Sequence, residues 1–133
     1  MGGWRGRTGV WGFAALVLAQ APSLAQAQVA GPWSVSGQIA GTPFAVDCRF
    51  EPQGSTLGGV CVETAAGLSG FKAGKVHVLK AVGVEGRQVR WSYEASFLLA
   101  HFDVVYSGTV DADHMAGTVA AAGRKGAFTA VRK

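Results

Sequence analysis

The stretch Asp47–Cys61, DCRFEPQGSTLGGVC, contains both cysteines of the 133-residue chain, with Gly54-Ser55 halfway between them. A leading glycine suits a type II′ turn, so this pair predicts a two-residue hairpin loop. The loop places Cys48 directly opposite Cys61, in a non-hydrogen-bonded pair whose Cα atoms lie roughly 4.5 Å apart. A disulfide accepts that separation. The stretch therefore predicts a β-hairpin with one cross-strand disulfide.

Two other roles for the cysteines are a redox-active pair and a metal site. A redox-active pair more often has the C-x-x-C spacing. A metal site needs further ligands, whereas Asp47 and Arg49 point to the opposite face of the strand. An even cysteine count in an exported chain favours the disulfide, which should stabilise the fold by roughly 3 kcal/mol.

Outside this hairpin, apolar and polar residues alternate along the chain, with turn signals about every ten residues. Eight strands are predicted, within residues 31–41, 43–51, 56–64, 75–82, 87–94, 101–110, 115–121 and 126–133. Short turns join nearly all neighbours, which is typical of a meander, and eight such strands can close into a barrel. The predicted fold class is all-β: an eight-stranded antiparallel up-and-down barrel with one hairpin disulfide.

The alternation also assigns inward faces. In the hairpin formed by residues 75–94, the predicted inward residues are Val76, Val78, Val82, Val89, Trp91 and Tyr93. The segment EASFLLA, residues 94–100, is open to three readings: it could extend a strand, form a short helix or cover one end of the barrel.

The first 27 residues have the pattern of a secretory signal peptide. Arg5 and Arg7 provide a basic start, Val10–Ala19 is an apolar run, and AQA at residues 25–27 is a small-x-small cleavage site. The run is too short to span a bilayer, which takes about 20 residues. We expect cleavage after Ala27, a single β-barrel domain at residues 28–133, a periplasmic or extracellular location, and no stable membrane anchor after cleavage.

The charge of the predicted mature chain is small. The whole chain carries +4, but without Arg5 and Arg7 ten basic residues face eight acidic ones. The remaining lysines and arginines are scattered and are not interleaved with exposed aromatic residues. Nucleic-acid binding is therefore not predicted.

Gly31-Pro32-Trp33 opens the first predicted strand, and Arg132 lies near the end of the last. This combination resembles the calycin superfamily, which includes the lipocalins, fatty-acid-binding proteins and avidins. The resemblance implies that Gly31, Trp33 and Arg132 form a structural lock, with the guanidinium stacked on the indole where first and last strands meet. Residues 106–132 also resemble the closing strands of small secreted bacterial β-barrel proteins of uncharacterised function.

A second resemblance concerns the beginning of the predicted domain. AGPWSVSG at residues 30–37, followed by DCRF at residues 47–50, is similar to the opening of bacterial periplasmic inhibitors of secreted metalloproteases. These inhibitors are small barrels that place their N-terminal segment in the protease cleft. The resemblance implies such a role for Gln28–Pro32.

An inward row of residues with little or no side chain, called the glycine wall below, is the main candidate for a ligand site. Turns centred on Ala112-Asp113 and Gly123-Arg124 would align Gly108, Gly117 and Ala130 in one inward row, and glycine inside a strand often marks close approach of another group. Either neighbouring aromatic rings fill this space or they line an apolar pocket. The candidate ligand-binding residues are Trp91, Tyr93, Phe102, Tyr106, Gly108 and Gly117. Lys80, expected to face Trp91, and Glu63, at the inner end of the third strand, are candidate inward polar residues, although both lie near strand ends, where a solvated rim is the usual explanation.

Candidates for catalysis are weaker. His101 and Asp103 share one strand face, and Asp111, Asp113 and His114 cluster in a turn. For both groups a solvent-facing surface or a turn is the simpler explanation. No catalytic residue, metal ligand or cofactor is assigned.

The leading hypothesis is therefore an exported, non-enzymatic protein that binds a small apolar ligand or a protein partner. The alternatives are a periplasmic protease inhibitor acting through Gln28–Pro32, and a barrel cyclase or isomerase that uses a side chain such as His101.

Overall fold

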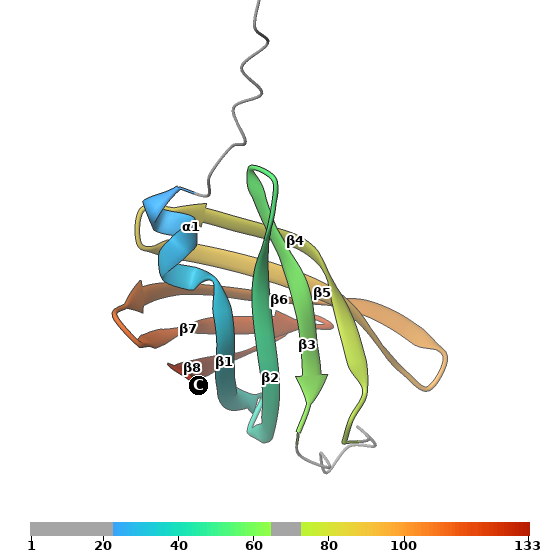
Figure 1. Cartoon of the computed structure of the whole chain (residues 1–133). Helices are drawn as coiled ribbons and strands as arrows, with labels where there is room; N and C mark the ends of the chain where they lie inside the picture. Colours follow the sequence, from blue (N-terminus) through green and yellow to red (C-terminus); the bar gives the residue numbers. More distant parts are fainter. Residues whose placement is uncertain (1–22, 65–72) are drawn as a thin grey trace, which may run out of the picture.

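The computed structural model describes residues 23–64 and 73–133, and it confirms the predicted eight-stranded antiparallel meander barrel (Figure 1). A short helix, α1 (Leu24–Val29), precedes the strands. The strands are β1 (Gly31–Ile39), β2 (Thr42–Gln53), β3 (Thr56–Glu63), β4 (Val76–Glu85), β5 (Gln88–Phe97), β6 (Ala100–Asp111), β7 (His114–Ala121) and β8 (Arg124–Arg132). Pairing of β1 with β8 closes the sheet.

Because consecutive strands are antiparallel, their connections alternate between the two ends of the barrel. The closed end holds α1 and the turns at residues 54–55, 86–87 and 112–113. The open end holds the turns at residues 40–41, 98–99 and 122–123 and the connection from β3 to β4.

The hairpin of β2 and β3 has the register predicted from Gly54-Ser55. Cys48 lies opposite Cys61 with a Cα–Cα distance of 4.0 Å, and the two form a disulfide. Both side chains are buried in the core. A disulfide is consistent with an oxidising extracellular or periplasmic compartment.

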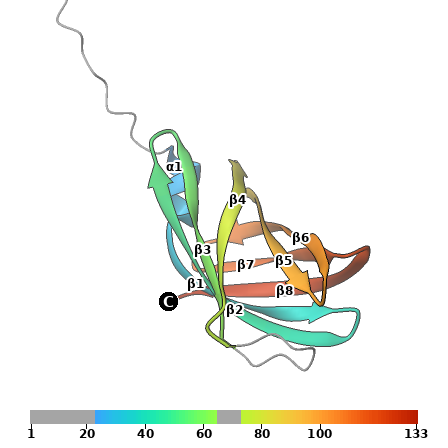
Figure 2. The same cartoon turned by 90° about the vertical axis from the view of Figure 1, so that its right-hand side faces the viewer.

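The shortest strand pairing in the barrel is the one between β3 and β4. These strands share three residue pairs, centred on Cys61 opposite His77, whereas every other neighbouring pair of strands shares at least six. Toward the closed end the β2–β3 hairpin stands away from β4 (Figure 2). Helix α1 bridges this gap, since it contacts β4 and the Gln26 side chain donates to Ser55 O at 2.7 Å.

The predicted inward face of β4 is wrong at its beginning. Val76 and Val78 are exposed, and His77 is buried. The β4–β5 register shifts between Leu79 and Ala81. Because one extra residue reverses which side chains face inward, odd-numbered residues face the core before this bulge and even-numbered ones after it. Lys80, expected to face Trp91, is instead exposed.

The predicted pairing of Gly117 with Ala130 is also wrong. The turn between β7 and β8 is Ala122-Gly123, with φ of 51° and 74°, and not Gly123-Arg124. Gly117 therefore lies opposite Phe128. The pairing of Gly108 with Gly117 is confirmed.

Residues 94–100 lengthen a hairpin. β5 continues to Phe97, the turn is Leu98-Leu99, and β6 begins at Ala100, opposite Phe97. The apolar run is therefore a strand extension at the open end.

The residues expected to form the lock lie together at the closed end. The Arg132 guanidinium lies 4.4 Å from the centre of the Trp33 ring, and Nη1 donates to Ala30 O at 2.7 Å. Gly31 has φ of 104°, and a Cβ there would lie 3.3 Å from Nη1. Trp33 Nε1 donates to Val29 O at 2.8 Å, and the Val29 side chain is fully buried. Helix α1 is thereby fixed over this end.

Residues 1–22 of the predicted signal peptide, and residues 65–72, lie outside the described residues. Ser23–Ala27 belong to the N-cap and the first part of α1, so the predicted cleavage site lies inside this helix.

We expect Cys48→Ala/Cys61→Ala to lower the free energy of unfolding by roughly 3 kcal/mol, because the disulfide restricts the unfolded chain. Urea denaturation followed by tryptophan fluorescence measures the change. Ser36→Ala/Thr129→Ala, an exposed cross-strand pair on β1 and β8, is the control and should stay within about 0.5 kcal/mol of wild type. A loss below about 1 kcal/mol for the cysteine variant would contradict the expected contribution.

Candidate functional site

A small cavity of about 60 Å³ lies inside the barrel toward the open end. Its wall is mostly apolar, with side chains from six strands: Ile39, Phe44, Ala45, Val46, Glu63, Tyr93, Ala95, Phe102, Val104, Tyr106 and Ala121. Pockets that enclose drug-sized ligands usually have about 300–1,000 Å³. The cavity therefore has room for a few heavy atoms of a ligand whose remainder lies at the rim.

Packed aromatic rings fill the barrel beneath this cavity. Trp91 stacks on Tyr106 with 4.7 Å between ring centres and 7° between planes, and Phe50 and Phe128 meet Trp91 edge-on at 5.1 and 5.3 Å. Such pairs stabilise a core beyond their buried area. This cluster separates the cavity from the closed end.

The glycine wall faces one of these rings. Gly108 lies next to Phe128, because a Cβ on Gly108 would come within 2.8 Å of Phe128 Cζ. The space that the sequence leaves free along Gly108 and Gly117 is therefore occupied by Phe128, a residue not among the predicted aromatic candidates.

The other sequence candidates divide between the cavity and this core. Tyr93, Phe102 and Tyr106 line the cavity, whereas Trp91 lies in the aromatic cluster. His101 is exposed, with its Nδ1 3.3 Å from Glu94 Oε1. Asp103 pairs with Lys80 at 2.9 Å on the outer surface.

The turn at residues 111–114 carries a structural contact. Asp113 accepts a hydrogen bond from Arg132 Nε at 3.1 Å. Among the described residues, no group of three or more His, Cys, Asp or Glu side chains is arranged to hold a metal ion.

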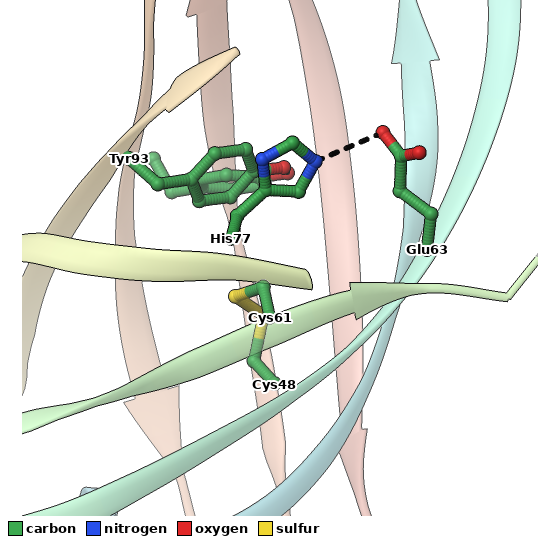
Figure 3. Close-up of a disulfide and its surroundings, with 6 residues drawn as sticks. Cys48, Cys61, Glu63, His77 and Tyr93 are labelled. Atoms are coloured by element: carbon green, nitrogen blue, oxygen red, sulfur yellow. Dashed lines mark hydrogen bonds and ion pairs between the residues drawn. A yellow bond between two sulfur atoms is a disulfide. The ribbon is translucent and has the colours of Figure 1, made fainter. Parts of the chain in front are cut away.

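A buried polar pair on β3 and β4 is the feature that distinguishes the cavity wall. Glu63 and His77 are 7% and 4% exposed, and Glu63 Oε1 lies 3.2 Å from His77 Nε2 (Figure 3). The His77 ring stacks on Tyr93, with ring centres 4.5 Å apart. Buried polar groups are costly unless paired, and this pair crosses the narrow β3–β4 contact.

The hydrogen bonds of His77 fix where its protons lie. Nδ1 is 3.2 Å from Glu94 O, and a carbonyl oxygen can only accept, so Nδ1 carries a proton. One further proton then lies between Nε2 and Glu63 Oε1, either on an imidazolium or on a carboxylic acid. In both arrangements Glu63 Oε2 is an acceptor, and this buried oxygen has no hydrogen-bond partner among the described residues.

The Tyr93 and Tyr106 hydroxyls lie 2.7 Å apart in the same wall. One donates to the other, so the accepting hydroxyl keeps a proton that this bond does not use. Burial raises the pKa of Tyr93 to about 12, and the bond to Tyr106 acts in the opposite direction. Burial, together with the charge of Tyr93, raises the pKa of Tyr106 well above its usual value. Both hydroxyls are therefore neutral donors at physiological pH.

Sequence reasoning placed Glu63 on the inner face but missed His77. Even-numbered valines surround His77 along β4, and its partners lie on other strands, at Glu63 and at the backbone of Glu94. The bulge near Lys80, which turns His77 inward, leaves no signal in the alternation.

No protein-family model matches the chain, and neither the curated proteins nor the solved structures include a significant match. The architecture is compatible with a calycin-like barrel. No helix within residues 23–64 and 73–133 has the length and apolarity needed to cross a bilayer.

The buried tyrosines predict a pH dependence. Tyr93 and Tyr106 are the two tyrosines of the chain, and their pKa values are higher in the folded protein than the value of about 10 in an unfolded chain. Their contribution to stability is thus present below pH 10 and falls as the pH rises toward 12. Absorbance at 295 nm should show no tyrosinate in the native protein at pH 10, while the urea-unfolded protein titrates near this pH. A native midpoint near 10 would contradict the burial of both hydroxyls.

Proposed function

We propose that the protein binds a small, largely apolar ligand at the open end of the barrel, with a hydrogen-bond donor of the ligand on Glu63 Oε2. The observation that carries this proposal is the unpartnered, buried Oε2 in the wall of an apolar cavity. An unsatisfied buried polar atom costs about 1–3 kcal/mol, more when it is charged. A ligand donor would remove this cost, so the site favours amines and other donors over anions.

The size of the cavity defines which part of the ligand enters. About 60 Å³ accommodates a head group and not a whole lipid or steroid. The unused tyrosine hydroxyl proton adds a donor in the same wall. The ligand class that fits has a compact polar head with a donor, attached to an apolar body at the rim.

The calycin-like resemblance supports this proposal, since members of that superfamily bind small molecules inside closed barrels. The proposal includes that the protein is an exported calycin-like barrel, which its architecture, the Trp33–Arg132 contact and the disulfide support. Gln28–Pro32 offers less support for protease inhibition, because Val29 is buried and Arg132 binds the Gln28 and Ala30 carbonyls. A segment held in this way would have to leave the barrel to enter a protease cleft.

A series of six-carbon probes tests the proposal: n-hexylamine, 1-hexanol and hexanoate, titrated against the purified protein. Binding is followed by the NMR shifts of the Ala95 and Ala121 methyl groups, which line the cavity. We expect the amine to bind most tightly and hexanoate least.

Glu63→Gln should weaken hexylamine binding roughly tenfold or more, since a hydrogen bond to a charged group contributes about 1.5–3 kcal/mol, while 1-hexanol binding changes little. The glutamine amide can still donate to His77 Nε2, so the fold is kept. Glu51→Gln, an exposed change on β2, is the matched control. Equal affinity for all three probes, or no shift at either alanine, would refute the proposal.

Proton transfer is a second candidate function, favoured by the donor and acceptor in one cavity wall. Glu63 would take an α-proton from a small ketone while a tyrosine hydroxyl donates to the enolate oxygen that forms; return of the proton to the same carbon would regenerate the ketone, and delivery to a different carbon would complete an isomerisation. The exposed His101 plays no part in this version.

The probe for this second function is cyclopentanone in D₂O. Protein-dependent loss of its α-proton NMR signals, abolished in Glu63→Gln and retained in Glu51→Gln, is the expected result if the site transfers protons. Exchange at the rate of buffer alone would exclude it for this ketone class.

A further inference from the structure

Exposed apolar side chains gather at the open end, on the part of the rim formed by β4, β5 and β6. Of the seven large hydrophobic side chains exposed among the described residues, five lie here: Val76, Val78, Phe97, Leu98 and Leu99. Leu98 and Leu99 form the tip of the β5–β6 hairpin and are 87% and 97% exposed. An apolar cluster of this kind marks an interaction surface.

The tip has an unfavourable turn sequence. Six two-residue turns join strands in the described part of the chain, and five of them contain glycine or aspartate, whereas this one is Leu98-Leu99. Leu98 adopts φ of 56°, a conformation that glycine, asparagine and aspartate accept far more readily than leucine. Leu98 thus strains the turn, as alanine does in three other turns, and neither leucine is buried in the core.

Cationic side chains surround the same end. Lys75 precedes β4, and Arg124 and Lys125 begin β8 beside the 122–123 turn. All three are exposed, and none forms a salt bridge with another described residue. Acidic side chains are scarce near these connections. In the described part of the chain, one lies within two residues of an open-end turn or of the β3–β4 connection, and it is the buried Glu63.

We propose that the open end docks on an anionic lipid surface, with Leu98 and Leu99 inserted among the lipids and the basic residues facing the head groups. Aliphatic side chains at a protruding tip gain from leaving water, and basic residues near an anionic surface add electrostatic attraction. The charge pattern favours a lipid surface over a second copy of the chain, because two cationic ends would repel each other.

Docking in this orientation would place the mouth of the cavity against the lipid. Ala95 and Phe102 are cross-strand partners in the cavity wall, and Phe97 continues the same strand face toward the tip. This inference goes beyond the proposed ligand binding and does not depend on it.

Vesicle flotation tests the proposal with protein recovered from the periplasm or medium of an expressing bacterium, so that an uncleaved apolar leader does not dominate binding. The probes are vesicles of phosphatidylcholine alone and of phosphatidylcholine with phosphatidylglycerol in equal parts. We expect wild type to float with the anionic vesicles and to bind the neutral ones more weakly.

Leu98→Asn/Leu99→Ser should raise the lipid concentration for half-maximal binding at least tenfold, because transfer of each leucine favours the lipid by about that factor or more. Asparagine accepts the φ of residue 98, so this variant should fold. Lys75→Gln/Arg124→Gln/Lys125→Gln should weaken binding to anionic vesicles by about 10–100-fold, at roughly fivefold per basic residue. Val131→Ser, an exposed change on β8 near the closed end, should have no effect.

Three outcomes would overturn the proposal. They are wild-type protein that stays unbound with anionic vesicles, equal losses for Leu98→Asn/Leu99→Ser and Val131→Ser, and self-association without vesicle binding that disappears in the leucine variant. The last would assign the tip to a contact between copies of the chain.

Discussion

Closure of the sheet between β3 and β4 is the constraint on which the rest of this structure depends. Three residue pairs hold these strands together. Side-chain contacts must therefore add to the few backbone hydrogen bonds between them. The disulfide anchors β3 to β2 at Cys61, the residue that lies opposite His77. The Glu63–His77 contact crosses the same boundary further toward the open end. The two interactions fix the position of β3, and the cavity wall depends on both.

The same constraint determines what the cavity offers chemically. β4 pairs with β5 from Leu79 onward, and His77 Nδ1 donates to Glu94 O where the strands have parted. The imidazole Nδ1 therefore takes the place of a backbone hydrogen-bond donor to Glu94 O. The remaining ring nitrogen, Nε2, shares a hydrogen bond with Glu63 Oε1. Because the ring is held on both sides, Oε2 is the atom of this pair left for a ligand, at a position set by the backbone of three strands.

The sequence was sufficient for the architecture wherever a tight turn set the register. Gly54-Ser55 predicted the partner of Cys48 and hence the disulfide. At the last hairpin the predicted turn was one residue too late, which moved the partner of Gly117 by two positions, from Phe128 to Ala130. Such an error keeps every side chain on its correct face, so the core composition was right while the residue filling the glycine wall was missed.

The candidate site was less predictable because it depends on a change of face. Val76, Val78 and Val82 continue one alternation across the bulge near Lys80, so the reversal that buries His77 has no local signal. The partners of His77 lie 14 and 17 residues away in sequence, and the first of these separations spans a connection whose length does not determine a register.

The two ends of the barrel differ in the hydrogen-bond partners and the exposure of their side chains. At the closed end, Arg132 contacts the Trp33 ring and the Gln28 and Ala30 carbonyls at the end of α1, and Asp113 binds the same guanidinium. Each of these polar groups has a protein partner. At the open end a carboxylate oxygen lacks one, and two leucines occupy a turn that glycine or asparagine would stabilise. The open end thus combines an unpartnered buried carboxylate oxygen in the cavity wall with two exposed leucines in a tight turn, which is the pattern expected when that end contacts something outside the chain.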